Sequence, residues 1–348
     1  MRISTLLSYA GGFKEAVAEV AELEKAGLDV VWVPEAYSFD APSAMGYIAS
    51  RTERVTIASG ILPIYSRTPS LLAMTAAGID YLSDGRCMLG LGASGPQVIE
   101  GFHGVPYEAP VARTREIIDI CRMVWRRERV QHLGKYYQIP LPQDRGTGLG
   151  KPLKLINHPV REEIPIAVAS LGPASVAMTA ELADAWLPAF YTAEAAHDVW
   201  GDALAKGRAK RDPQRPPLEI FAGGMVAIGE GQEHLRDLAR PGAALYIGGM
   251  GARSKNFYND IFSKSGYAAE AKQIQDLYLA GEKQAAEAAI PDEYLARNSL
   301  IGPQDFVKER LYALQESGVT SLNVSFAGKT PAERVAQCER LRNLVDTL

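Results

Sequence analysis

Residues 14–33 read KEAVAEVAELEKAGLDVVWV and place a helix and a strand directly beside each other. Apolar side chains recur at helical spacing as far as Ala26, and Gly27 follows at the point where a helix commonly ends. The run Val30-Val31-Trp32-Val33 contains no polar residue, which is typical of a strand buried on both faces. Strands of this kind belong to parallel sheets that are covered by helices.

The same helix-and-strand unit repeats along the chain. Eight strands are predicted, near residues 2–8, 28–34, 55–61, 86–92, 164–169, 184–188, 218–228 and 320–326, and a last helix over 330–347. Eight alternating repeats predict an α/β fold of the (β/α)8 TIM barrel type, with a closed parallel sheet. The alternative is an open, doubly wound sheet. Residues 9–12 (YAGG), after the first strand, lack the GxGxxG turn that such a sheet would carry for a dinucleotide.

No linker-like stretch interrupts the 348 residues, so a single domain over residues 1–348 is expected. Two connections are longer than usual, about 127–163 and, after strand 7, 229–302. The first includes a predicted hairpin at 131–139 that turns at Gly134. The second includes predicted helices at 268–280 and 283–289. Insertions of this length commonly build the roof of an active site or a subunit contact.

The composition argues against several classes of protein. With 37 basic and 41 acidic residues, the net charge of −4 gives no general attraction for nucleic acid or anionic membranes. Three widely spaced cysteines and five histidines show no metal-ligand spacing, so neither a metal site nor a disulfide framework is expected. There is no signal peptide and no apolar run of about 18 residues, so we expect a cytoplasmic protein.

In a TIM barrel, the chemistry is carried by the carboxyl ends of the strands. Glu35 is the only carboxylate directly after strand 2. It is a candidate acid/base or a group that orients a ring nitrogen; alternatively, it pairs with a neighbouring Arg or Lys. Ser59, Gly60 and Ile61 end strand 3, where the glycine indicates either a bulge close to a ligand or simple packing.

Two further strand ends are rich in small residues. Ala93-Ser94-Gly95, after strand 4, would leave backbone N–H groups open and allow a planar ring to approach. Ser170-Leu171-Gly172, after strand 5, precede Pro173 at a predicted helix start. The N–H groups of Leu171 and Gly172 would face an anion such as a phosphate, and Ser170 would add a hydroxyl. An ordinary helix cap is the alternative.

Four blocks of sequence, in order, carry a resemblance to a known family. They are LGLGASGPQV at 89–98 with EGFHG at 100–104, KNFYN at 255–259, residues 277–303, and GVTSLNV at 318–324. In these blocks the chain resembles coenzyme F420-dependent oxidoreductases of actinobacterial type, a branch of the luciferase-like monooxygenase superfamily. The resemblance covers nearly the whole chain. It implies a barrel with an insertion after strand 7, a homodimer, and F420 or FMN bound on the strand ends.

The resemblance also implies roles for the candidate residues. A non-prolyl cis peptide at Gly60–Ile61, or at Ser59–Gly60, would back the central ring. Ala93, Ser94 and Gly95 would line the side chain of the cofactor, and Ser170, Leu171 and Gly172 would hold its phosphodiester. Glu35 would contact the polar edge of the ring. Arg67, Arg253 or Lys255 would meet the acidic oligoglutamate tail.

The chain departs from the family pattern at two places. Ala36 stands where related enzymes carry a histidine, and Ser94-Gly95-Pro96 replaces the glutamate of the sugar-phosphate dehydrogenases. The first hypothesis is hydride transfer between C5 of F420 and an unidentified organic substrate. The alternatives are an FMNH2-dependent monooxygenase and a non-catalytic F420-binding protein.

Overall fold

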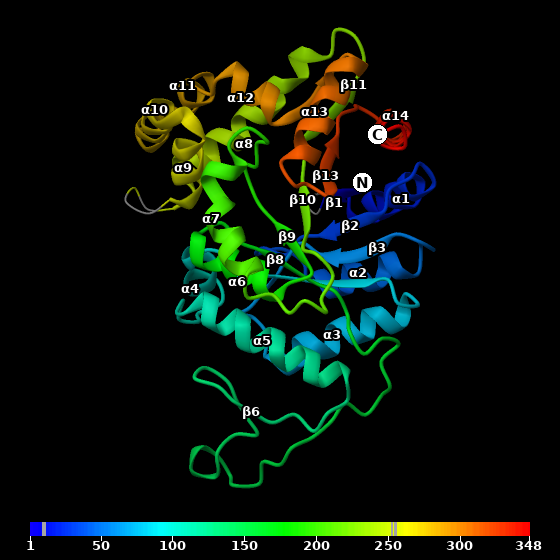
Figure 1. The fold of residues 1–348 in the computed structure, drawn as a ribbon, viewed down its shortest axis with the longest axis vertical. Coiled ribbons are helices and arrows are strands. Elements are labelled where there is room, and N and C mark those ends of the chain that lie inside the picture. Colours follow the sequence, from blue (N-terminus) through cyan, green and yellow to red (C-terminus); the bar gives the residue numbers. More distant parts are fainter. Residues whose placement is uncertain (9–11, 252, 254–255) are drawn as a thin grey trace.

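The computed structural model describes residues 1–8, 12–251, 253 and 256–348. Eight parallel strands follow one another around a closed sheet, and the last, β13, pairs back onto the first, β1. They are β1 (Arg2–Leu6), β2 (Val30–Val33), β3 (Thr56–Ser59), β5 (Cys87–Gly92), β8 (Ile166–Ala169), β9 (Ala185–Leu187), β10 (Glu219–Ala222) and β13 (Ser321–Phe326). The predicted TIM barrel is therefore confirmed (Figure 1).

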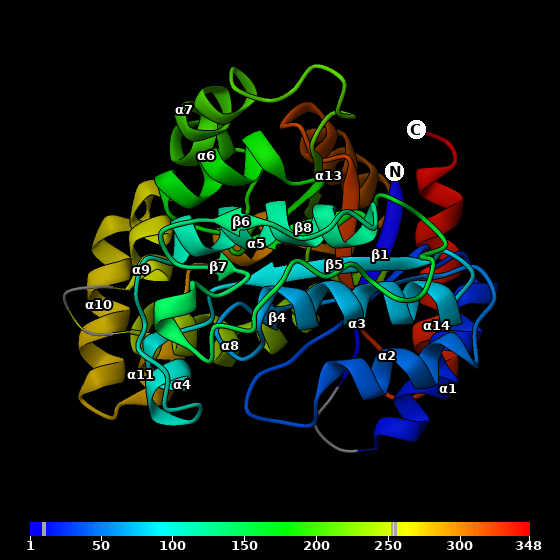
Figure 2. The ribbon, with the colours of Figure 1, turned by 90° about the horizontal axis from the view of Figure 1, so that it is seen from below.

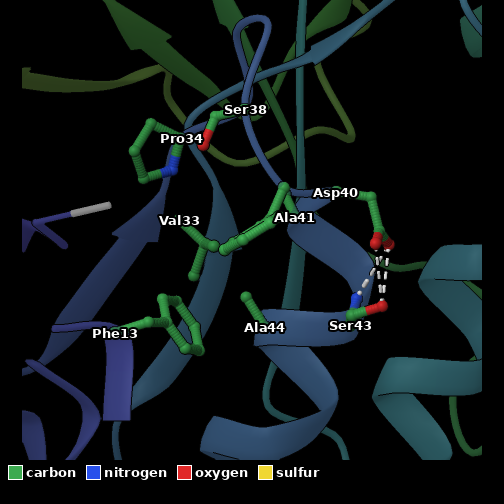
Figure 3. A pocket seen from close by; sticks show the side chains of 9 residues that line it. Phe13, Val33, Pro34, Ser38, Asp40, Ala41, Ser43 and Ala44 are labelled. Carbon is green, nitrogen blue, oxygen red and sulfur yellow. Dashed lines mark hydrogen bonds between the residues drawn. The ribbon is translucent and has the colours of Figure 1, made fainter. Parts of the chain in front are cut away.

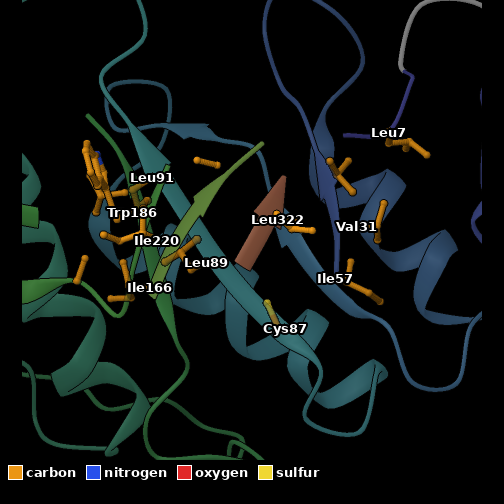
Figure 4. Close-up of a cluster of buried hydrophobic side chains, with 14 of the residues drawn as sticks. Leu7, Val31, Ile57, Cys87, Leu89, Leu91, Ile166, Trp186, Ile220 and Leu322 are labelled. Atoms are coloured by element: carbon orange, nitrogen blue, oxygen red, sulfur yellow. The ribbon is translucent and has the colours of Figure 1, made fainter. Parts of the chain in front are cut away.

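Helices surround the barrel and bury the outward faces of its strands. They are α1 (Phe13–Lys25), α2 (Ala41–Ala49), α3 (Pro69–Leu82), α5 (Pro110–Trp125), α6 (Pro173–Leu182), α7 (Ala196–Arg208), α13 (Gln304–Glu316) and α14 (Pro331–Val345). Every second residue of β5, namely Cys87, Leu89 and Leu91, belongs to this outer core (Figure 4). This alternation follows from the two-residue period of a strand.

The inside of the barrel is filled by side chains from the other face of the strands. Trp32 and Phe221 meet edge to face, with their ring centroids 5.0 Å apart, among Val30, Ala58 and Met88. The indole Nε1 of Trp32 donates to Ser4 Oγ at 2.9 Å. The barrel is therefore a packed core, and a ligand has to bind at one of its ends.

The seventh predicted strand, 218–228, is divided in the structure. It runs as β10, breaks at Gly223-Gly224, and continues as β11 (Met225–Ile228). A side chain at Gly224 would begin 2.2 Å from the carbonyl oxygen of Asn298, so the chain passes too close there for any other residue. Strand β12 (Ser299–Gly302), which pairs with β11, is not among the eight predicted strands.

The insertion after strand 7 forms a helical subassembly with its own apolar core around Phe262, Ile274 and Tyr294. It contains η2 (Glu233–Ala239), α8 (Arg240–Ala244), η3 (Leu245–Gly249), α9 (Phe257–Phe262), η4 (Ser263–Tyr267), α10 (Ala268–Leu279), α11 (Lys283–Ala288) and α12 (Asp292–Arg297). The helices predicted near 268–280 and 283–289 are confirmed as α10 and α11. Figure 1 shows these elements gathered on one side of the barrel.

The other insertion, 127–163, forms an arm that lies below α5 in Figure 1 and in front of it in Figure 2. It begins with the predicted hairpin, β6 (His132–Leu133) and β7 (Gln138–Ile139), closed by Gly134 N donating to Tyr137 O at 2.9 Å. The short helix η1 (Gln143–Arg145) follows. Within the described residues, no helix is long and apolar enough to cross a membrane. The single-domain organisation of residues 1–348 stays a prediction.

Candidate functional site

The predicted site residues come from four strands that are neighbours in the sheet, β2, β3, β5 and β8. Val33 pairs with Ser59, and Gly92 pairs with Ala169, so these strands end at similar heights. Because the strands are parallel, Glu35, Ser59–Ile61, Ala93–Gly95 and Ser170–Gly172 all follow their carboxyl ends. The structure therefore brings the predicted residues to one arc of the barrel mouth.

The chain is kinked at the end of β3. Ser59 Oγ donates to Gly90 O at 2.9 Å and accepts from Gly90 N at 2.8 Å, and Gly60 N donates to Val33 O at 2.7 Å. The Gly60–Ile61 peptide bond is cis. Pairing with β5 then resumes in β4 (Leu62–Pro63). This kink sets Gly60 and Ile61 at the mouth.

The glycines of β5 make room for this kink. A side chain at Gly90 would begin 1.8 Å from the carbonyl oxygen of Ser59. A side chain at Gly92 would begin 2.8 Å from the Ile61 side chain. Within β5, glycine is therefore required because Ser59 and Ile61 approach closely. The approach of a planar cofactor ring is not needed to explain it. At Gly95, beyond the strand, a side chain would begin 3.4 Å from Gln97 Oε1, so this position is much less crowded.

Several backbone N–H groups at the mouth are open. Within the described residues, the N–H groups of Ile61, Ser94, Gly95, Leu171 and Gly172 donate no hydrogen bond to the protein. Ser94 has a φ of 57°, which is uncommon for a residue with a side chain. Gly172 is the N-cap of α6 and offers no side-chain cap, so the first turn of that helix presents free donors. Donors of this kind suit carbonyl oxygens and anions.

The turn before α6 is held from behind by two buried indoles. Trp186 Nε1 donates to Ser170 O at 3.0 Å, and Trp200 Nε1 donates to Leu171 O at 3.1 Å. The Ser170 hydroxyl is buried and lies 2.9 Å from Thr179 Oγ1, which itself donates to a backbone carbonyl. The open donors of this turn are therefore the N–H groups of Leu171 and Gly172, whereas the Ser170 hydroxyl faces the protein.

Glu35 pairs with Arg67, which is one of the two alternatives that the sequence left open. The guanidinium donates to both carboxylate oxygens, at 2.5 and 2.8 Å, and Ala41 N donates to Oε2 at 2.8 Å. Both side chains are largely buried. Arg67 is thus occupied by Glu35, and Arg253 by Asp276 at 2.9 Å. Lys255 lies outside the described residues.

Two cavities open near the mouth. One, of about 300 Å³, lies beside the turn from β2 to α2 and is lined by Phe13, Val33, Pro34 and Ala44, among others (Figure 3). Asp40, the one charged residue among the described residues that line it, caps α2 by accepting from Ser43 N at 3.1 Å. Asp40 therefore has a structural role there.

The larger cavity, of about 450 Å³, lies between the mouth and the insertion after strand 7. Its described lining includes Leu6, Asn323 and Ser325 from the barrel, and Tyr246 and Tyr258 from the insertion. No motif in the sequence assigns these residues to the site, although Asn323 and Ser325 are polar residues that alternate with apolar ones along β13. Among the described residues, no cluster of three or more His, Cys, Asp or Glu is arranged to hold a metal ion.

The comparisons with known proteins agree with this architecture. The sequence profile of the luciferase-like monooxygenase family matches residues 1–321. Rv3520c of Mycobacterium tuberculosis, named as a provisionally assigned coenzyme F420-dependent oxidoreductase, is 40% identical over 310 residues, which cover 88% of this chain and 89% of that protein. The 5,10-methylenetetrahydromethanopterin reductase of Archaeoglobus fulgidus is 25% identical, with 86% of this chain and 85% of that protein covered.

Among solved structures, the coenzyme F420-dependent tetrahydromethanopterin reductase of Methanopyrus kandleri superposes with a TM-score of 0.80. The match covers 99% of both chains at 17% identity, so it bears on the fold alone. The profile match and the 40% identity to Rv3520c over most of both chains decide the family. The chain belongs to the luciferase-like monooxygenase family.

Proposed function

We propose that the chain is an F420-dependent oxidoreductase that binds the cofactor on the arc of strand ends formed by β2, β3, β5 and β8. The single observation that carries this proposal is the row of open N–H donors from Ile61 to Gly172, in a chain 40% identical to a relative named for F420. When bound, F420 supplies hydride transfer at its C5 carbon. The chain supplies binding, orientation and the exclusion of water.

The residues at the mouth fit such a cofactor. A side chain at Gly60 would begin 3.0 Å from Trp32 Cβ and 3.3 Å from Leu6 Cδ1, so glycine is needed for the close packing of the kink, and a flat ring would lie against its backbone. The N–H groups of Leu171 and Gly172, at the positive end of the α6 dipole, would hold the phosphodiester. Ile61, Ser94 and Gly95 would donate to oxygens of the ring and its side chain. We leave Ser170 out of these contacts because its hydroxyl faces Thr179.

Glu35 keeps a place in the proposed site, as a positioning residue. Its two oxygens are taken up by Arg67 and Ala41 N, so it holds the guanidinium in one orientation next to the mouth. A bidentate pair of this kind is geometrically well defined. Arg67, held in this way, is the group we propose to meet the polar edge of the ring.

The turnover experiment separates this function from its alternatives. Oxidation of F420H2 is followed with enones, quinones and aldehydes as acceptors. Turnover of F420H2 with any of them supports the proposal. Oxygen-dependent product formation with FMNH2 and none with F420H2 would instead support a monooxygenase. Tight F420 binding without turnover of any acceptor would favour a binding protein.

The substitution Gly172→Asp tests the proposed phosphate position. Gly172 has a φ of −76°, and a side chain there would begin 3.5 Å from the Phe257 ring and 3.8 Å from Ser175 Oγ, which are ordinary contacts, so the fold accepts an aspartate. Aspartate is a good N-cap, so the melting temperature should be unchanged or higher. Its charge should weaken F420 binding by roughly 10- to 100-fold through repulsion of the phosphodiester. Fluorescence titration measures the change.

The matched control is Gly172→Asn, which has nearly the same shape without the charge. It should retain most of the affinity for F420. The deazariboflavin that lacks the phosphodiester should bind Gly172→Asp and wild type about equally. If Gly172→Asp binds F420 as tightly as wild type, the phosphate does not lie at this turn.

We also propose a homodimer formed by α3 and the arm. On α3, Met74 and Tyr81 are 52% and 66% exposed; on the arm, Leu153 and Ile156 are 66% and 89% exposed. The arm is fixed to α3 by Arg161, whose Nε donates to Asp80 at 3.1 Å, so both form one surface. Exposed apolar side chains on two segments that are linked in this way are typical of an interaction site, and a second copy can bury them symmetrically.

The variants Met74→Glu and Leu153→Glu should convert the dimer to a monomer. A buried, unpaired charge at a symmetric contact occurs twice and strongly opposes association. Light scattering coupled to size-exclusion chromatography measures the mass. Tyr312→Glu, on α13, is the control because Tyr312 is 48% exposed and lies away from α3. A monomeric wild type, or a Tyr312→Glu variant that dissociates equally, would contradict this interface.

A cytoplasmic location is part of the proposal. It is supported by three free cysteines, Cys87, Cys121 and Cys338, all of them buried. Unpaired thiols are typical of proteins that work in reducing compartments.

A further inference from the structure

The larger cavity borders the position proposed for the cofactor. Leu6 belongs to both places, because it lines the cavity and its Cδ1 lies 3.3 Å from where a side chain at Gly60 would begin. Asn323 and Ser325, at the end of β13, complete the barrel side of the cavity. A molecule in this cavity would therefore lie next to a ring bound against the kink at Gly60.

The opposite wall is aromatic and is centred on Phe190. The Phe190 ring lies 5.9 Å from Tyr246 and 5.6 Å from Tyr258, both edge to face, and stacks on Tyr294 at 6.4 Å. Phe190 has a φ of 56°, a rare conformation for a bulky residue. Such backbone outliers concentrate at ligand sites, where the surrounding structure enforces them. A wall of this composition suits a flat, apolar molecule.

Arg236 is the one charged side chain among the described residues that line this cavity. Its Nη2 donates to Ile301 O at 2.6 Å, and its guanidinium carbon lies 4.9 Å from the centre of the Phe306 ring. Within the described residues, no carboxylate forms an ion pair with it, and its buried Nε has no hydrogen-bond partner. A partly buried guanidinium without a counter-charge favours an anion beside it.

A second polar group on the lining of this cavity, the Tyr258 hydroxyl, also suits a negatively charged oxygen. Burial, and secondarily the nearby Tyr246 hydroxyl, raises the pKa of Tyr258 to about 12. The Tyr258 hydroxyl therefore stays protonated at neutral pH and is a hydrogen-bond donor. The cavity thus combines an aromatic wall with one cation and several neutral polar side chains, among them Tyr258, Asn323 and Ser325, and no acidic residue among its described lining.

We propose that this cavity binds the organic substrate as a flat, largely apolar molecule with one carboxylate, which pairs with Arg236. The aromatic wall around Phe190 would receive the apolar body, and the barrel side would place it beside the cofactor. The inference rests on the proposed function only in calling the bound molecule the substrate. The binding preference itself can be measured without any cofactor.

A matched pair of probes tests the proposal, 2-naphthoate and its neutral amide, 2-naphthamide. Calorimetric titration is carried out on the protein alone and on the protein saturated with oxidised F420. Wild type should bind the carboxylate about tenfold more tightly than the amide, since a charge-assisted hydrogen bond is stronger than a neutral one. Added salt should reduce this preference.

Three variants separate the cation from the aromatic wall. Arg236→Gln should lose the preference for the carboxylate and bind both probes about equally. Arg236→Lys should retain part of the preference, because the charge remains but the planar fork is lost. Phe190→Ala should weaken both probes by a similar factor. If Arg236→Gln does not fold, the proposal is still tested by the preference of wild type for the carboxylate and by the binding of both probes to Arg236→Lys and Phe190→Ala.

Several results would overturn the proposal. These are equal binding of the two probes by wild type, no binding of either at millimolar concentration, or an unchanged preference in a folded Arg236→Gln variant. Tighter binding of glucose 6-phosphate than of naphthoate would contradict the proposal that the substrate is a flat, largely apolar molecule. Binding of naphthoate by a protein that does not bind F420 would refute the proposed function and leave the carboxylate site standing.

Discussion

The substitution Gly90→Ala is expected to destabilise the protein by about 3–5 kcal/mol, as overpacking against rigid backbone does at its upper end. The new methyl group would begin 1.8 Å from the carbonyl oxygen of Ser59. Neither chain can yield easily, because Ser59 Oγ is bonded to both the N–H and the carbonyl of Gly90. The melting temperature should fall by about 4–7 °C for a chain of this length.

Two other glycines serve as a graded comparison. At Gly92, the obstruction is the side chain of Ile61, which can move, so Gly92→Ala should cost less than Gly90→Ala. At Gly242, nothing lies within 4 Å, and Gly242→Ala should leave the stability unchanged or slightly higher. Differential scanning calorimetry of the three variants tests the order. A Gly90→Ala variant as stable as Gly242→Ala would refute the close approach of β3 and β5.

The second large effect is expected at Glu24, in α1. Its carboxylate is buried and accepts from the backbone N–H groups of Arg54 and Val55, both at 2.6 Å, and of Glu53 at 3.1 Å. Glu24→Ala would leave these three donors without a partner at the entry to β3. Because each unsatisfied buried donor is costly, we expect a loss of about 2–4 kcal/mol in the free energy of unfolding.

The same carboxylate predicts a pH dependence. Burial raises the pKa of Glu24, but the three backbone N–H groups and the nearby Arg54 charge outweigh burial and lower it below its usual 4.5. A carboxyl group with a lowered pKa in the folded state contributes its stability above the unfolded-state value. The stability is lost as the pH falls through the folded-state value. The stability difference between wild type and Glu24→Gln should therefore shrink below about pH 4.5.

Glu22→Ala is the control for both measurements, because Glu22 lies on the same helix but forms an exposed pair with Lys25. Exposed pairs contribute little, so its loss should be about 0–0.5 kcal/mol at any pH. Urea unfolding between pH 3 and 7 gives the comparison. A Glu24→Gln variant whose deficit grows at acid pH would contradict the expected sign.

Much of the fold could be read from the sequence, because its signals are local. The helix predicted to start at Pro173 begins there as α6, and the last helix, predicted over 330–347, is observed as α14 over Pro331–Val345. Their boundaries are set by proline at the first turn and by residues that end helices, so neighbouring residues suffice. The break at Gly223-Gly224 and the extra strand β12 could not be predicted, because they depend on Asn298 and Asn323, far away in the chain.

The candidate site divides in the same way. The positions of Glu35, Gly60, Ser94 and Gly172 at strand ends followed from the barrel rule. The partners of these residues could not be predicted in this way. Arg67, for example, pairs with Glu35 although the two residues are 32 positions apart in the sequence. The Ser170 hydroxyl is predicted to face a ligand but turns to Thr179, in the second turn of α6. Partners of polar groups are decided by packing, which sequence patterns do not contain.

The larger cavity was missed for a related reason. Its wall combines Leu6, near the start of the chain, with Phe190, Arg236 and Ser325 from three later segments. None of these residues belongs to a recognisable motif. Only the alternation of polar and apolar residues in β13 could have directed attention to Asn323 and Ser325.

The central claim is that the mouth of the barrel holds F420 with its phosphodiester at the turn before α6. Titration of the intrinsic tryptophan fluorescence with F420 and, separately, with FMN tests it most directly, because Trp200 and Trp186 are bonded to that turn. We expect saturable quenching at micromolar F420 and a much weaker response to FMN. Saturation at micromolar FMN with no response to F420 would contradict the assignment.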